Sequence, residues 1–510
     1  MIKTVTDYLE ITADRLPEKT AFCDEKREIT FSEIRTESQK IASVISRQNI
    51  FDKPICIFME KSVECINAML SIVYSGNFYT VLDVDMPEAR IQKILEVLSP
   101  VAIITNEAHL TAAKEIVAKD NSLSEEGIIV YEEAMKEDFD KEGLLEIREK
   151  IDINSTMFVL FTSGSTGVPK GVIIPHRAFP PYINWYADTF HFDETTVFAN
   201  QAPFYFIMSC PDIFLTILVG ATCHIVPKKA FSFPMVTLNY LKERHVNVLY
   251  WVPSVLCMIA NFRALPEVHL DDLKHVMFGG EVMPSKQMNM WRKEYPNVQF
   301  TNLYGPTETT EMISYYVIDR DVSDSESLPI GIPASYIKVI LLDENDKEVA
   351  PGEIGELCAA GISIADGYYN MPEKTKEVFV KNPVFKEGDD PESIRMYRTG
   401  DLAKIDENGD LIYMGRKDFQ IKHMGNRIEL GEIETAVSAL NGIDQNCCLY
   451  DTKRSRIVLF YTGTATEDYI NEELRNALPV YMIPNRIEKL EKMPFNINGK
   501  IDRAALKEQI

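Results

Sequence analysis

The segment FTSGSTGVPKGV, residues 161–172, combines the residue types that bind phosphate groups. Glycines let backbone N–H groups approach an anion closely, hydroxyl groups donate hydrogen bonds, and a lysine supplies positive charge. The common pattern G-x-x-x-x-G-K-[ST] does not fit, because Pro169 precedes Lys170 and Gly171 follows it. The segment therefore predicts a phosphate site of another kind, with a Ser/Gly surface turn as the alternative. The residues concerned are Thr162, Ser163, Gly164, Ser165, Thr166, Gly167 and Lys170.

A second candidate for chemistry is Glu308, which follows the tight Gly305-Pro306 turn in NLYGPTETT, residues 302–310. A carboxylate in such a turn can hold Mg²⁺ against a phosphate group, because Mg²⁺ prefers oxygen ligands. An acid on a solvated loop is the alternative. The nine cysteines form no CxxC pair or Cys/His cluster, so the sequence predicts reduced thiols and no zinc site.

The elements that must position these residues follow a β/α alternation through much of the first 300 residues. The pattern predicts helices over 62–76 and 88–99 and strands over 78–84, 101–105 and 157–162. This alternation is typical of a doubly wound parallel sheet. From about residue 328 short strands and Gly/Pro turns predict a β-rich subdomain.

A further small unit follows GRKDFQIKHMGNRIEL, and its charge differs from the rest of the chain. Residues 419–510 hold 12 Lys+Arg and 13 Asp+Glu, so −23 of the formal net charge of −24 lies in residues 1–418. The chain is too long for one ordinary domain. The composition therefore predicts a boundary near residue 418.

Composition also excludes some classes of protein. The acidic balance argues against nucleic-acid binding. The N-terminus has acids early and lacks the apolar core of a signal peptide. The apolar stretch 204–226 is interrupted by Pro211, Asp212 and His224, so it predicts a buried helix and strand and no membrane insertion. We expect a cytoplasmic protein.

Six motifs in order give the chain a resemblance to the adenylate-forming superfamily. Within it, the chain is most similar to stand-alone adenylation domains such as the D-alanine:carrier protein ligases, over nearly its full length. Each motif alone is weak, and their common order is specific. The motifs are FTSGSTGVPKGV, NLYGPTETT, GEIGEL (352–357), YRTGDLA (397–403), GRKDFQIKHMGNRIELGEIE (415–434) and NGKIDR (498–503).

The resemblance implies an α/β fold with a large N-terminal domain and a small, mobile C-terminal domain. The large domain, residues 1–417, would contain two doubly wound sheets and a β-barrel-like subdomain from about 328. The small α+β domain, residues 418–510, would carry the catalytic lysine. The implied reaction joins ATP and a carboxylic acid into an acyl-adenylate and pyrophosphate, and then transfers the acyl group to a thiol. ATP and Mg²⁺ are the implied cofactors.

The resemblance also assigns roles to single residues. Lys500 would stabilise the charge that develops at the α-phosphate, and Glu308 would hold Mg²⁺. Asp401 would accept the ribose hydroxyls with help from Arg416, and Asp418 would be the hinge. Taken alone, each has an ordinary alternative as a loop acid, a turn aspartate, a surface arginine or a terminal lysine. The remaining residues implied for ATP are the phosphate loop and Gly280, Glu281, Asn302, Leu303, Tyr304, Gly305 and Thr307.

The substrate pocket is carried over by motif spacing. In family members acting on α-amino acids, an aspartate that pairs with the ammonium stands where this chain has Ile207. Isoleucine cannot pair with that charge, which favours an aromatic, apolar or distal-amine acid. If the spacing is displaced by a bulge, Asp212 would be the partner, and D-alanine or another α-amino acid is the alternative substrate. The implied pocket residues are Ile207, Met208, Pro211, Tyr250, Met277, Gly279, Leu303, Glu311 and Met312.

The thiol acceptor is expected to be a separate phosphopantetheinylated carrier protein, because no carrier-like GG-[HD]-S motif occurs before Ile510. An acyl- or aryl-CoA ligase shares the same chemistry and is the alternative enzyme. A non-catalytic adenylate-binding module is the alternative of a different class.

Overall fold

The computed structural model describes residues 4–120, 122–164, 167–495 and 501–510 and divides into two units. The first unit consists of Met1–Val84, Ser99–Leu160 and Val172–Lys417. The second consists of Asp85–Leu98, Phe161–Gly171 and Asp418–Ile510. The division into domains at residues 417 and 418 stays a prediction. The contact-based units assign two earlier segments, 85–98 and 161–171, to the second unit.

One sheet has seven strands in the order β18-β8-β7-β4-β3-β5-β6, and its central strands β4, β3, β5 and β6 run parallel. Strands β3 and β4 are buried at every residue and have the continuous apolar sequences PICIF and FYTVL. Such runs are typical of parallel strands covered on both faces. The strands are β3 (Pro54–Phe58), β4 (Phe78–Leu82), β5 (Ala102–Thr105), β6 (Ile128–Val130), β7 (Thr156–Thr162), β8 (Lys170–Pro175) and β18 (Gly367–Tyr368).

The second sheet has nine strands in the order β15-β14-β13-β12-β11-β9-β10-β1-β2. Strands β13, β12, β11, β9, β10 and β1 run parallel, and antiparallel strands lie at both edges. The strands are β1 (Thr20–Cys23), β2 (Glu28–Thr30), β9 (Val197–Asn200), β10 (Thr222–Ile225), β11 (Val248–Trp251), β12 (His275–Gly279), β13 (Gln299–Tyr304), β14 (Ser314–Val317) and β15 (Ile332–Pro333).

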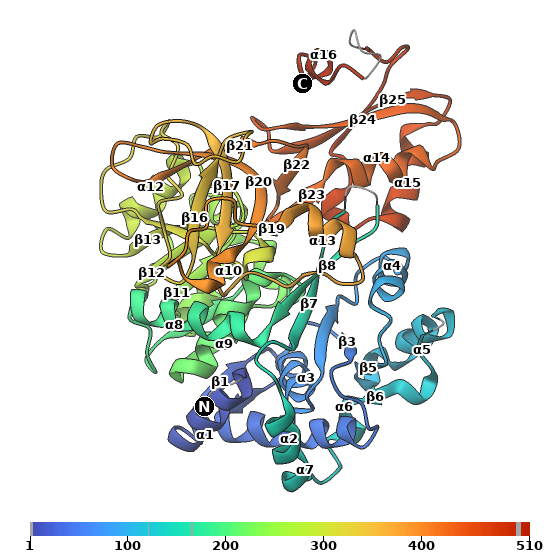
Figure 1. The fold of residues 1–510 in the computed structure, drawn as a ribbon, viewed down its shortest axis with the longest axis vertical. Helices are drawn as coiled ribbons and strands as arrows, with labels where there is room; N and C mark the ends of the chain where they lie inside the picture. Colours follow the sequence, from blue (N-terminus) through green and yellow to red (C-terminus); the bar gives the residue numbers. More distant parts are fainter. Residues whose placement is uncertain (1–3, 121, 165–166, 496–500) are drawn as a thin grey trace. The chain divides into compact units, whose positions relative to one another are not determined.

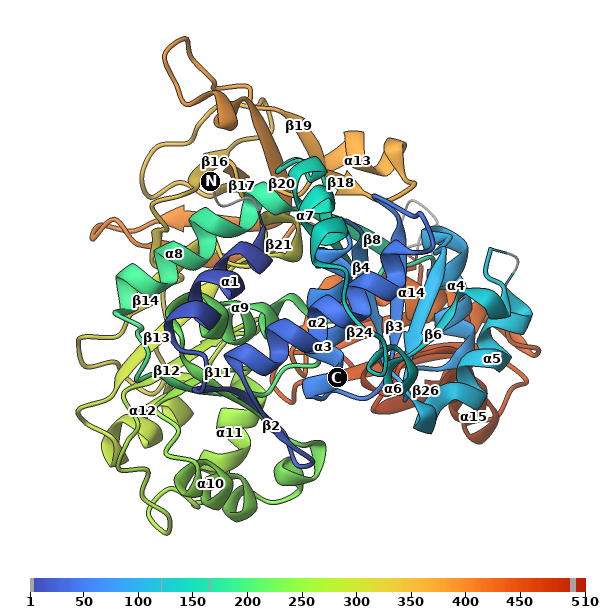
Figure 2. The same ribbon diagram turned by 90° about the horizontal axis from the view of Figure 1, so that it is seen from below.

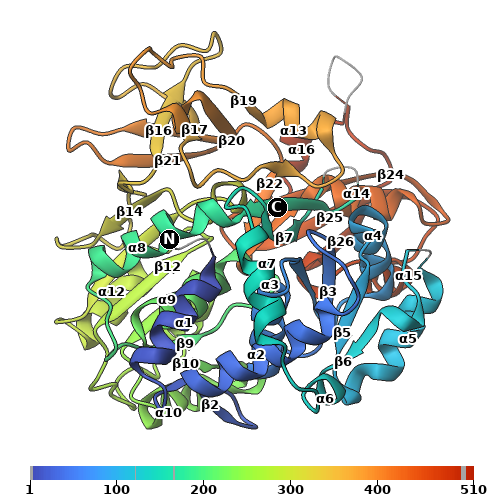
Figure 3. The same cartoon turned by 60° about the horizontal axis from the view of Figure 1, so that its bottom comes forward.

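Helices pack on these sheets. Helix α2 (Phe31–Ser46) begins with a capping box formed by Thr30 and Glu33, and it lies beside α3 (Val63–Tyr74) (Figure 2). Helix α7 (Lys141–Lys150) packs against both (Figure 3). The other α-helices of the first unit are α1 (Val5–Arg15), α5 (Leu110–Lys119), α6 (Tyr131–Ala134), α8 (Phe179–Phe190), α9 (Cys210–Val219), α10 (Pro234–Glu243), α11 (Pro253–Asn261), α12 (Ser285–Glu294) and α13 (Pro372–Val378).

The apolar stretch 204–226 forms α9 and β10, and the helix is buried through most of its length. The prediction of a buried helix and strand is therefore confirmed. Across the described ranges of the chain, no helix is both long and apolar enough to cross a membrane.

The predicted β-rich subdomain is a five-stranded antiparallel sheet. Its strand order is β16-β17-β20-β19, and β21 pairs with β20. The strands are β16 (Lys338–Leu342), β17 (Gly355–Ala360), β19 (Phe379–Lys381), β20 (Arg395–Ile405) and β21 (Leu411–Arg416).

The C-terminal part of the second unit is an α+β fold (Figure 1). A three-stranded sheet in the order β24-β25-β26 is joined by a β22-β23 hairpin. Its core packs Ile433 of α14 and Leu474 of α15 with Leu459 of β25. The elements of this part are β22 (Gln420–His423), β23 (Asn426–Glu429), α14 (Leu430–Ser438), β24 (Ile443–Asp451), β25 (Arg456–Gly463), α15 (Glu467–Ala477), β26 (Arg486–Lys489) and α16 (Arg503–Lys507). The second unit also contains α4 (Glu88–Leu98), from its first segment. The fold class is thus the predicted mixed α/β class, with a large N-terminal part and a small C-terminal part.

Candidate active site

Four of the predicted pocket residues lie on three neighbouring parallel strands, and three of them are within one residue of a carboxyl end. Tyr250 on β11 pairs with Met277 on β12, and Gly279 on β12 pairs with Leu303 on β13. Because side chains alternate along a strand, this register places all four on one face of the sheet. Ligands of open α/β sheets bind beyond the carboxyl ends of the strands.

Glu311 is a buried carboxylate that accepts hydrogen bonds from three tyrosines. Tyr182 and Tyr250 donate to its two oxygens, and the Tyr186 hydroxyl lies 3.3 Å from Oε2. Burial raises the pKa of Glu311 to about 7, although the three phenols act in the opposite direction. The acid predicted in the pocket is therefore an interior group with neutral donors around it.

Tyr182 and Tyr186 were not among the predicted residues, and they lie one turn apart on α8. Their rings meet edge to face, with centroids 5.4 Å apart, and both are fully buried. The spacing of four residues in FPPYINWYADTF was the available signal, since residues i and i+4 share one helix face.

The backbone after Glu308 turns Glu311 inward. Thr310 and Glu311 both have positive φ, of 56° and 86°. The chain also folds back on Gly305, where a Cβ would lie 1.8 Å from the Glu311 carbonyl oxygen. Only glycine fits at that position. The turn therefore couples the direction of the Glu311 side chain to the GPTE motif.

Ile207 and Met208 begin the short 3₁₀ helix Ile207–Ser209, and Pro211 lies in the first turn of α9. These side chains are buried with the apolar core, as is Met312. Their part in a substrate pocket stays a prediction.

Asp212, the alternative ammonium partner, belongs to a different polar cluster. Its Oδ2 accepts a hydrogen bond from Asn200 Nδ2 at 3.0 Å. The Lys61 ammonium donates to the carbonyl oxygens of Asn200 and Gln201 and acts electrostatically on Asp212. Burial raises the pKa of Asp212 to about 8 and lowers that of Lys61 to about 7. Asp212 thus has a cation of the protein nearby.

Three residues predicted for the nucleotide come together in the first unit. Asp401 on β20 lies opposite Arg416 on β21, and Arg416 Nη1 is 2.7 Å from Asp401 Oδ1. The Tyr304 hydroxyl, at the end of β13, donates to the other carboxylate oxygen. Burial and the negative charge of Asp401 raise the pKa of Tyr304 well above its ordinary value. The carboxylate of Asp401 is therefore held from two sides.

Glu308 lies in the 3₁₀ turn Thr307–Thr309 and is fully buried. The Tyr368 hydroxyl donates to its Oε1 at 2.8 Å. One buried carboxylate suits Mg²⁺, which completes its coordination with phosphate oxygens and water. Among the described residues no cluster of three or more His, Cys, Asp or Glu could hold a metal on protein ligands alone. Glu308 thus fits a Mg²⁺ ion that arrives with a nucleotide.

The remaining predicted nucleotide residues surround the ends of β12 and β13. Asn302 Nδ2 donates to the Pro329 carbonyl at 2.7 Å, and Glu281 Oε2 accepts from Ser254 N–H at 3.2 Å. Gly280 has a φ of 84°, and the Thr307 carbonyl closes the turn to Thr310 N–H. Their contact with adenine stays a prediction.

The phosphate loop belongs to the second unit, where protein groups bind its donors. Ser163 Oγ donates to the Arg427 carbonyl at 2.7 Å, and Gly164 N–H donates to Glu432 Oε2 at 3.2 Å. Lys170 Nζ lies 3.4 Å from Glu429 Oε1. Thr162 Oγ1 lies 3.5 Å from the Lys170 carbonyl, and Gly167 has a φ of 76°. Ser165, Thr166 and Lys500 lie outside the described residues.

Glu432 also forms an ion pair with Arg90 of α4, and both side chains are almost fully buried. Burial raises the pKa of Glu432, although Arg90 acts in the opposite direction. Asp418, the predicted hinge, is the first residue of the second unit after Lys417, and its Oδ1 accepts from Gln420 N–H at 3.1 Å.

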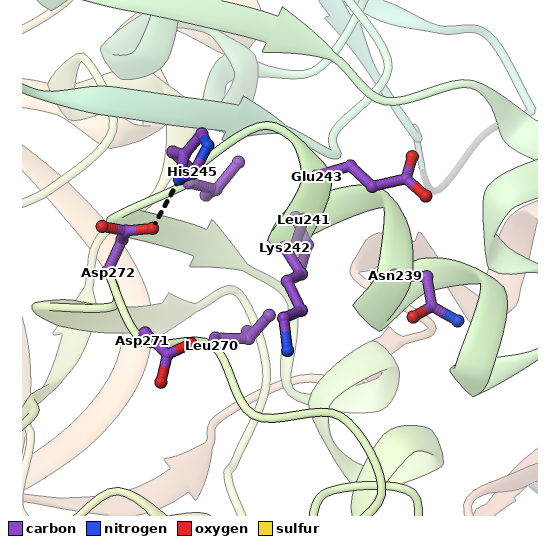
Figure 4. Close-up of a pocket in the computed structure, with 9 residues that line it drawn as sticks. Asn239, Leu241, Lys242, Glu243, His245, Leu270, Asp271 and Asp272 are labelled. Carbon is purple, nitrogen blue, oxygen red and sulfur yellow. Dashed lines mark hydrogen bonds and ion pairs between the residues drawn. The ribbon is translucent and has the colours of Figure 1, made fainter.

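A surface pocket of about 490 Å³ lies at the end of α10 (Figure 4). The side chains of His245 and Asp272 on its wall form an exposed hydrogen bond of 2.9 Å. Exposed pairs of this kind are screened by water and contribute little. None of the predicted site residues line this pocket, so it is not the candidate active site. The lining residues are Asn239, Leu241, Lys242, Glu243, His245, Val246, Leu270, Asp271 and Asp272.

Comparisons with known proteins agree with the motifs. Tyrocidine synthase 3 of Brevibacillus parabrevis is 32% identical over 99% of this chain, which spans 8% of that protein. Zwittermicin A synthase ZmaJ of Bacillus cereus is 31% identical over 96% of this chain and 92% of its own length. The chain thus spans a small part of one relative and nearly all of the other.

A solved structure shares the fold. Holo-PA1221, described as an NRPS protein containing adenylation and PCP domains bound to a vinylsulfonamide inhibitor, superposes with a TM-score of 0.82. The match covers 99% of this chain and 84% of that one at 23% identity. The model of the family described as AMP-binding enzyme matches residues 9–369. The chain therefore belongs to the AMP-binding enzyme family and is an adenylate-forming enzyme with the fold of adenylation domains.

Proposed function

We propose that this enzyme activates a carboxylic acid with ATP and passes the acyl group to the phosphopantetheine thiol of a separate carrier protein. In the first step a carboxylate oxygen bonds to the α-phosphorus, and the bond from that phosphorus to the β-phosphate oxygen breaks. Pyrophosphate leaves with the bonding electrons. In the second step the sulfur bonds to the acyl carbon, AMP leaves, and the thiol proton passes to solvent.

The observation that carries this proposal is the arrangement at the ends of β11, β12 and β13. Tyr250, Met277, Gly279 and Leu303 share one face there, and β13 leads directly into the turn that holds Glu308. The place where ligands bind in such sheets thus directly precedes the acidic turn. This arrangement supports an acid pocket beside a nucleotide site.

Each predicted residue would have its own role in binding ATP or in catalysis. Asp401, held by Tyr304 and Arg416, would accept the ribose hydroxyls. The loop around Ser163 and Gly164 would donate to the β- and γ-phosphates. Lys500 would stabilise negative charge at the α-phosphate, because a positioned ammonium acts most strongly where charge develops. Glu308 would hold Mg²⁺, which supplies charge neutralisation at the phosphates when it is bound.

The proposed acid has no ammonium on its α-carbon. The position that pairs with that ammonium in related enzymes is Ile207 here, a buried apolar side chain. Leaving a charged ammonium against it would be strongly unfavourable. An aromatic acid, an apolar acid or an acid with a distal amine is compatible with the apolar side chain of Ile207.

The carrier protein is proposed as the acceptor because a protein of the same fold contains adenylation and PCP domains in one chain. CoA is the other thiol that this chemistry can use. The two are separated by supplying the purified enzyme with ATP, an accepted acid and one acceptor at a time. The acceptors are CoA, a carrier protein with its phosphopantetheine arm, and the same carrier protein without it.

The test of the first step is a pyrophosphate-release screen over α-amino, β-amino, hydroxy and aromatic acids. Asp401→Asn should raise the KM for ATP about 10- to 100-fold, the range expected for losing a hydrogen bond to a charged group. Asp406→Asn is the matched control, because Asp406 lies in the turn of the same β20–β21 hairpin and is bound only to turn residues in the described structure. Its KM should stay at the wild-type value.

Failure of a folded enzyme to release pyrophosphate with every acid would overturn the proposal and favour a non-catalytic adenylate-binding protein. Acylation of CoA, with neither form of the carrier protein acylated, would reassign the acceptor and leave the first step in place.

A further inference from the structure

We propose that Glu311 is the group that recognises an ammonium of the acid substrate, on a carbon beyond the α-carbon. This inference rests on the proposed function, since it concerns the acid that the same site activates. It selects the distal-amine acids from the three classes that the apolar wall at Ile207 allows.

The first argument is charge. The groups that donate hydrogen bonds to Glu311 in the described structure are the phenols of Tyr182, Tyr250 and Tyr186, and none of them is a cation. No ion pair involving Glu311 is found among those residues. An interior carboxylate without a cation is unfavourable. An ammonium of the substrate would supply the missing positive charge. Its attraction to the carboxylate would be stronger in this low-dielectric interior than in water.

The second argument is the hydrogen-bonding capacity of the carboxylate. An ionised carboxylate has about four acceptor positions, and three phenols donate to this one. One acceptor position is therefore left for a further donor. The phenols also fix the orientation of the carboxylate, because they come from two elements, α8 and β11.

The third argument is the placement of Glu311. Tyr250, one of its donors, lies on the same face of the sheet as the pocket residue Met277. Two consecutive residues with positive φ, Thr310 and Glu311, form the backbone turn that carries this buried side chain. Backbone strain of this kind persists mainly where it serves a site.

Asp212 is another buried carboxylate with a raised pKa, and it is coupled electrostatically to Glu311. It is a weaker candidate for binding the ammonium. It has the Lys61 ammonium as an electrostatic partner and Asn200 as a hydrogen-bond donor. A substrate cation would therefore compete with a cation of the protein there. Glu311 has no such competitor among the described residues.

The experiment compares acids that differ only in an ammonium or a methyl group at the same position. The pairs are β-alanine and butanoate, 4-aminobutanoate and pentanoate, 5-aminopentanoate and hexanoate, 4-(aminomethyl)benzoate and 4-ethylbenzoate, and alanine and 2-methylpropanoate. Pyrophosphate release gives kcat/KM for each acid. We expect the wild-type enzyme to prefer the amine in at least one distal pair by about 100-fold, and not in the alanine pair.

Glu311→Gln keeps the size of the side chain and removes its charge, so the ratio of kcat/KM for the amine to that for its apolar partner should fall by about 100-fold. Glu311→Asp retracts the carboxylate by one methylene, so the preferred amine should move one carbon further from the acid. The matched control is Glu37→Gln, because Glu37 also accepts a hydrogen bond from a buried tyrosine, Tyr131, on another element. Its amine preference should equal that of the wild type.

The possible failures are distinct. If apolar acids release pyrophosphate and the amine-to-methyl ratio is the same in the wild type and in Glu311→Gln, this inference is wrong and the proposed function stands. A wild-type preference for alanine over 2-methylpropanoate, lost in Asp212→Asn, would assign the ammonium to Asp212. Absence of release with all ten acids and with the aromatic and hydroxy acids of the wider screen would count against the proposed function itself. Thermal unfolding of each variant separates a loss of recognition from a loss of folding, and Glu311→Asp remains informative if Glu311→Gln is unstable.

Discussion

At the scale of single residues, Glu311 combines three unfavourable features that the surrounding structure sustains. It is buried, it has a positive φ, and it follows Thr310, which also has a positive φ. Each such backbone conformation costs about 1–3 kcal/mol in a residue other than glycine. Three tyrosine hydroxyls and the close approach to Gly305 hold the arrangement in place. Residues that combine burial with a shifted pKa are more frequent at functional sites than elsewhere.

The raised pKa gives Glu311 a pH dependence that can be measured. Its ordinary value of 4.5 becomes about 7 in the folded protein, because burial disfavours the charged form. An ammonium binds to the ionised form, so kcat/KM for a distal-amine acid should fall about tenfold for each pH unit below 7. The apolar partner acid should lack this limb, and so should Glu311→Gln with either acid.

Protein stability provides a second readout of the same group. A carboxyl whose pKa is raised on folding stabilises the protein below pH 4.5 and loses that contribution as pH rises toward 7. As pH rises from 4.5 to 7, the free energy of unfolding of the wild type should therefore fall relative to that of Glu311→Gln. The other titratable groups around Glu311 are present in both proteins, so they contribute to the difference only through their electrostatic coupling to Glu311: Tyr182, Tyr186, Tyr250, Tyr336, Cys210 and Asp212. A constant difference across this range would contradict the raised pKa.

Motif spacing brought together part of the candidate site and could not supply the rest. It named Tyr250, Met277, Gly279 and Leu303, which the register places on one face of neighbouring strands. It also named Asp401, Tyr304 and Arg416, which form one cluster in the structure. The tyrosines of α8 were missed because hydrogen bonds to a residue more than 120 positions away leave no local pattern.

At the scale of elements, the local patterns predicted the first sheet well. The segments predicted as helices over 62–76 and 88–99 are α3 and α4, and those predicted as strands over 78–84, 101–105 and 157–162 are β4, β5 and β7. Apolar periodicity and continuous apolar runs are properties of a short window, so a sequence displays them directly. The grouping of α4 and the phosphate loop with residues 418–510 depends on contacts between distant segments, and no window contains it.

The Arg90–Glu432 ion pair is one of these distant contacts, and its removal should destabilise the second unit. The two side chains are 6% and 1% exposed. Arg90→Ala leaves the buried Glu432 carboxylate without its ion-pair partner, which should lower the free energy of unfolding by about 3–5 kcal/mol. Arg454→Ala is the matched control in the same unit, because Arg454 is 64% exposed in its pair with Asp451. That change should cost less than about 1 kcal/mol.

Urea unfolding followed by fluorescence and by circular dichroism measures both variants, because coincidence of two probes tests whether a chain of two units unfolds in one step. Equal midpoints for Arg90→Ala and Arg454→Ala would show that the buried pair contributes no more than a surface pair.

At the scale of the whole molecule, the chain divides its charge and its chemistry unequally. Residues 1–418 carry −23 of the net charge of −24, and residues 419–510 are close to neutral. Asp401, Glu308 and the predicted pocket residues on β11, β12 and β13 belong to the first unit. Asp418 begins the last segment of the second unit. The resemblance assigns Lys500, in that last segment, to adenylation alone. The two half-reactions should therefore respond separately to changes in this segment.

Asp418→Pro tests that separation. Proline fixes φ near −65° and so restricts the backbone where the hinge would turn. Acyl-adenylate formation, measured as pyrophosphate release in a single turnover, should remain within about threefold of the wild type, whereas thioester formation on the carrier protein should fall by about 100-fold or more. Asp418→Ala is the control, because it also removes the carboxylate that accepts Gln420 N–H but leaves the backbone free to turn. Lys500→Ala should give the reverse result, losing adenylate formation while still transferring a supplied acyl-adenylate, because only the first step develops charge at the α-phosphate. If Asp418→Pro loads its carrier protein at the rate of Asp418→Ala, the hinge lies elsewhere in the chain.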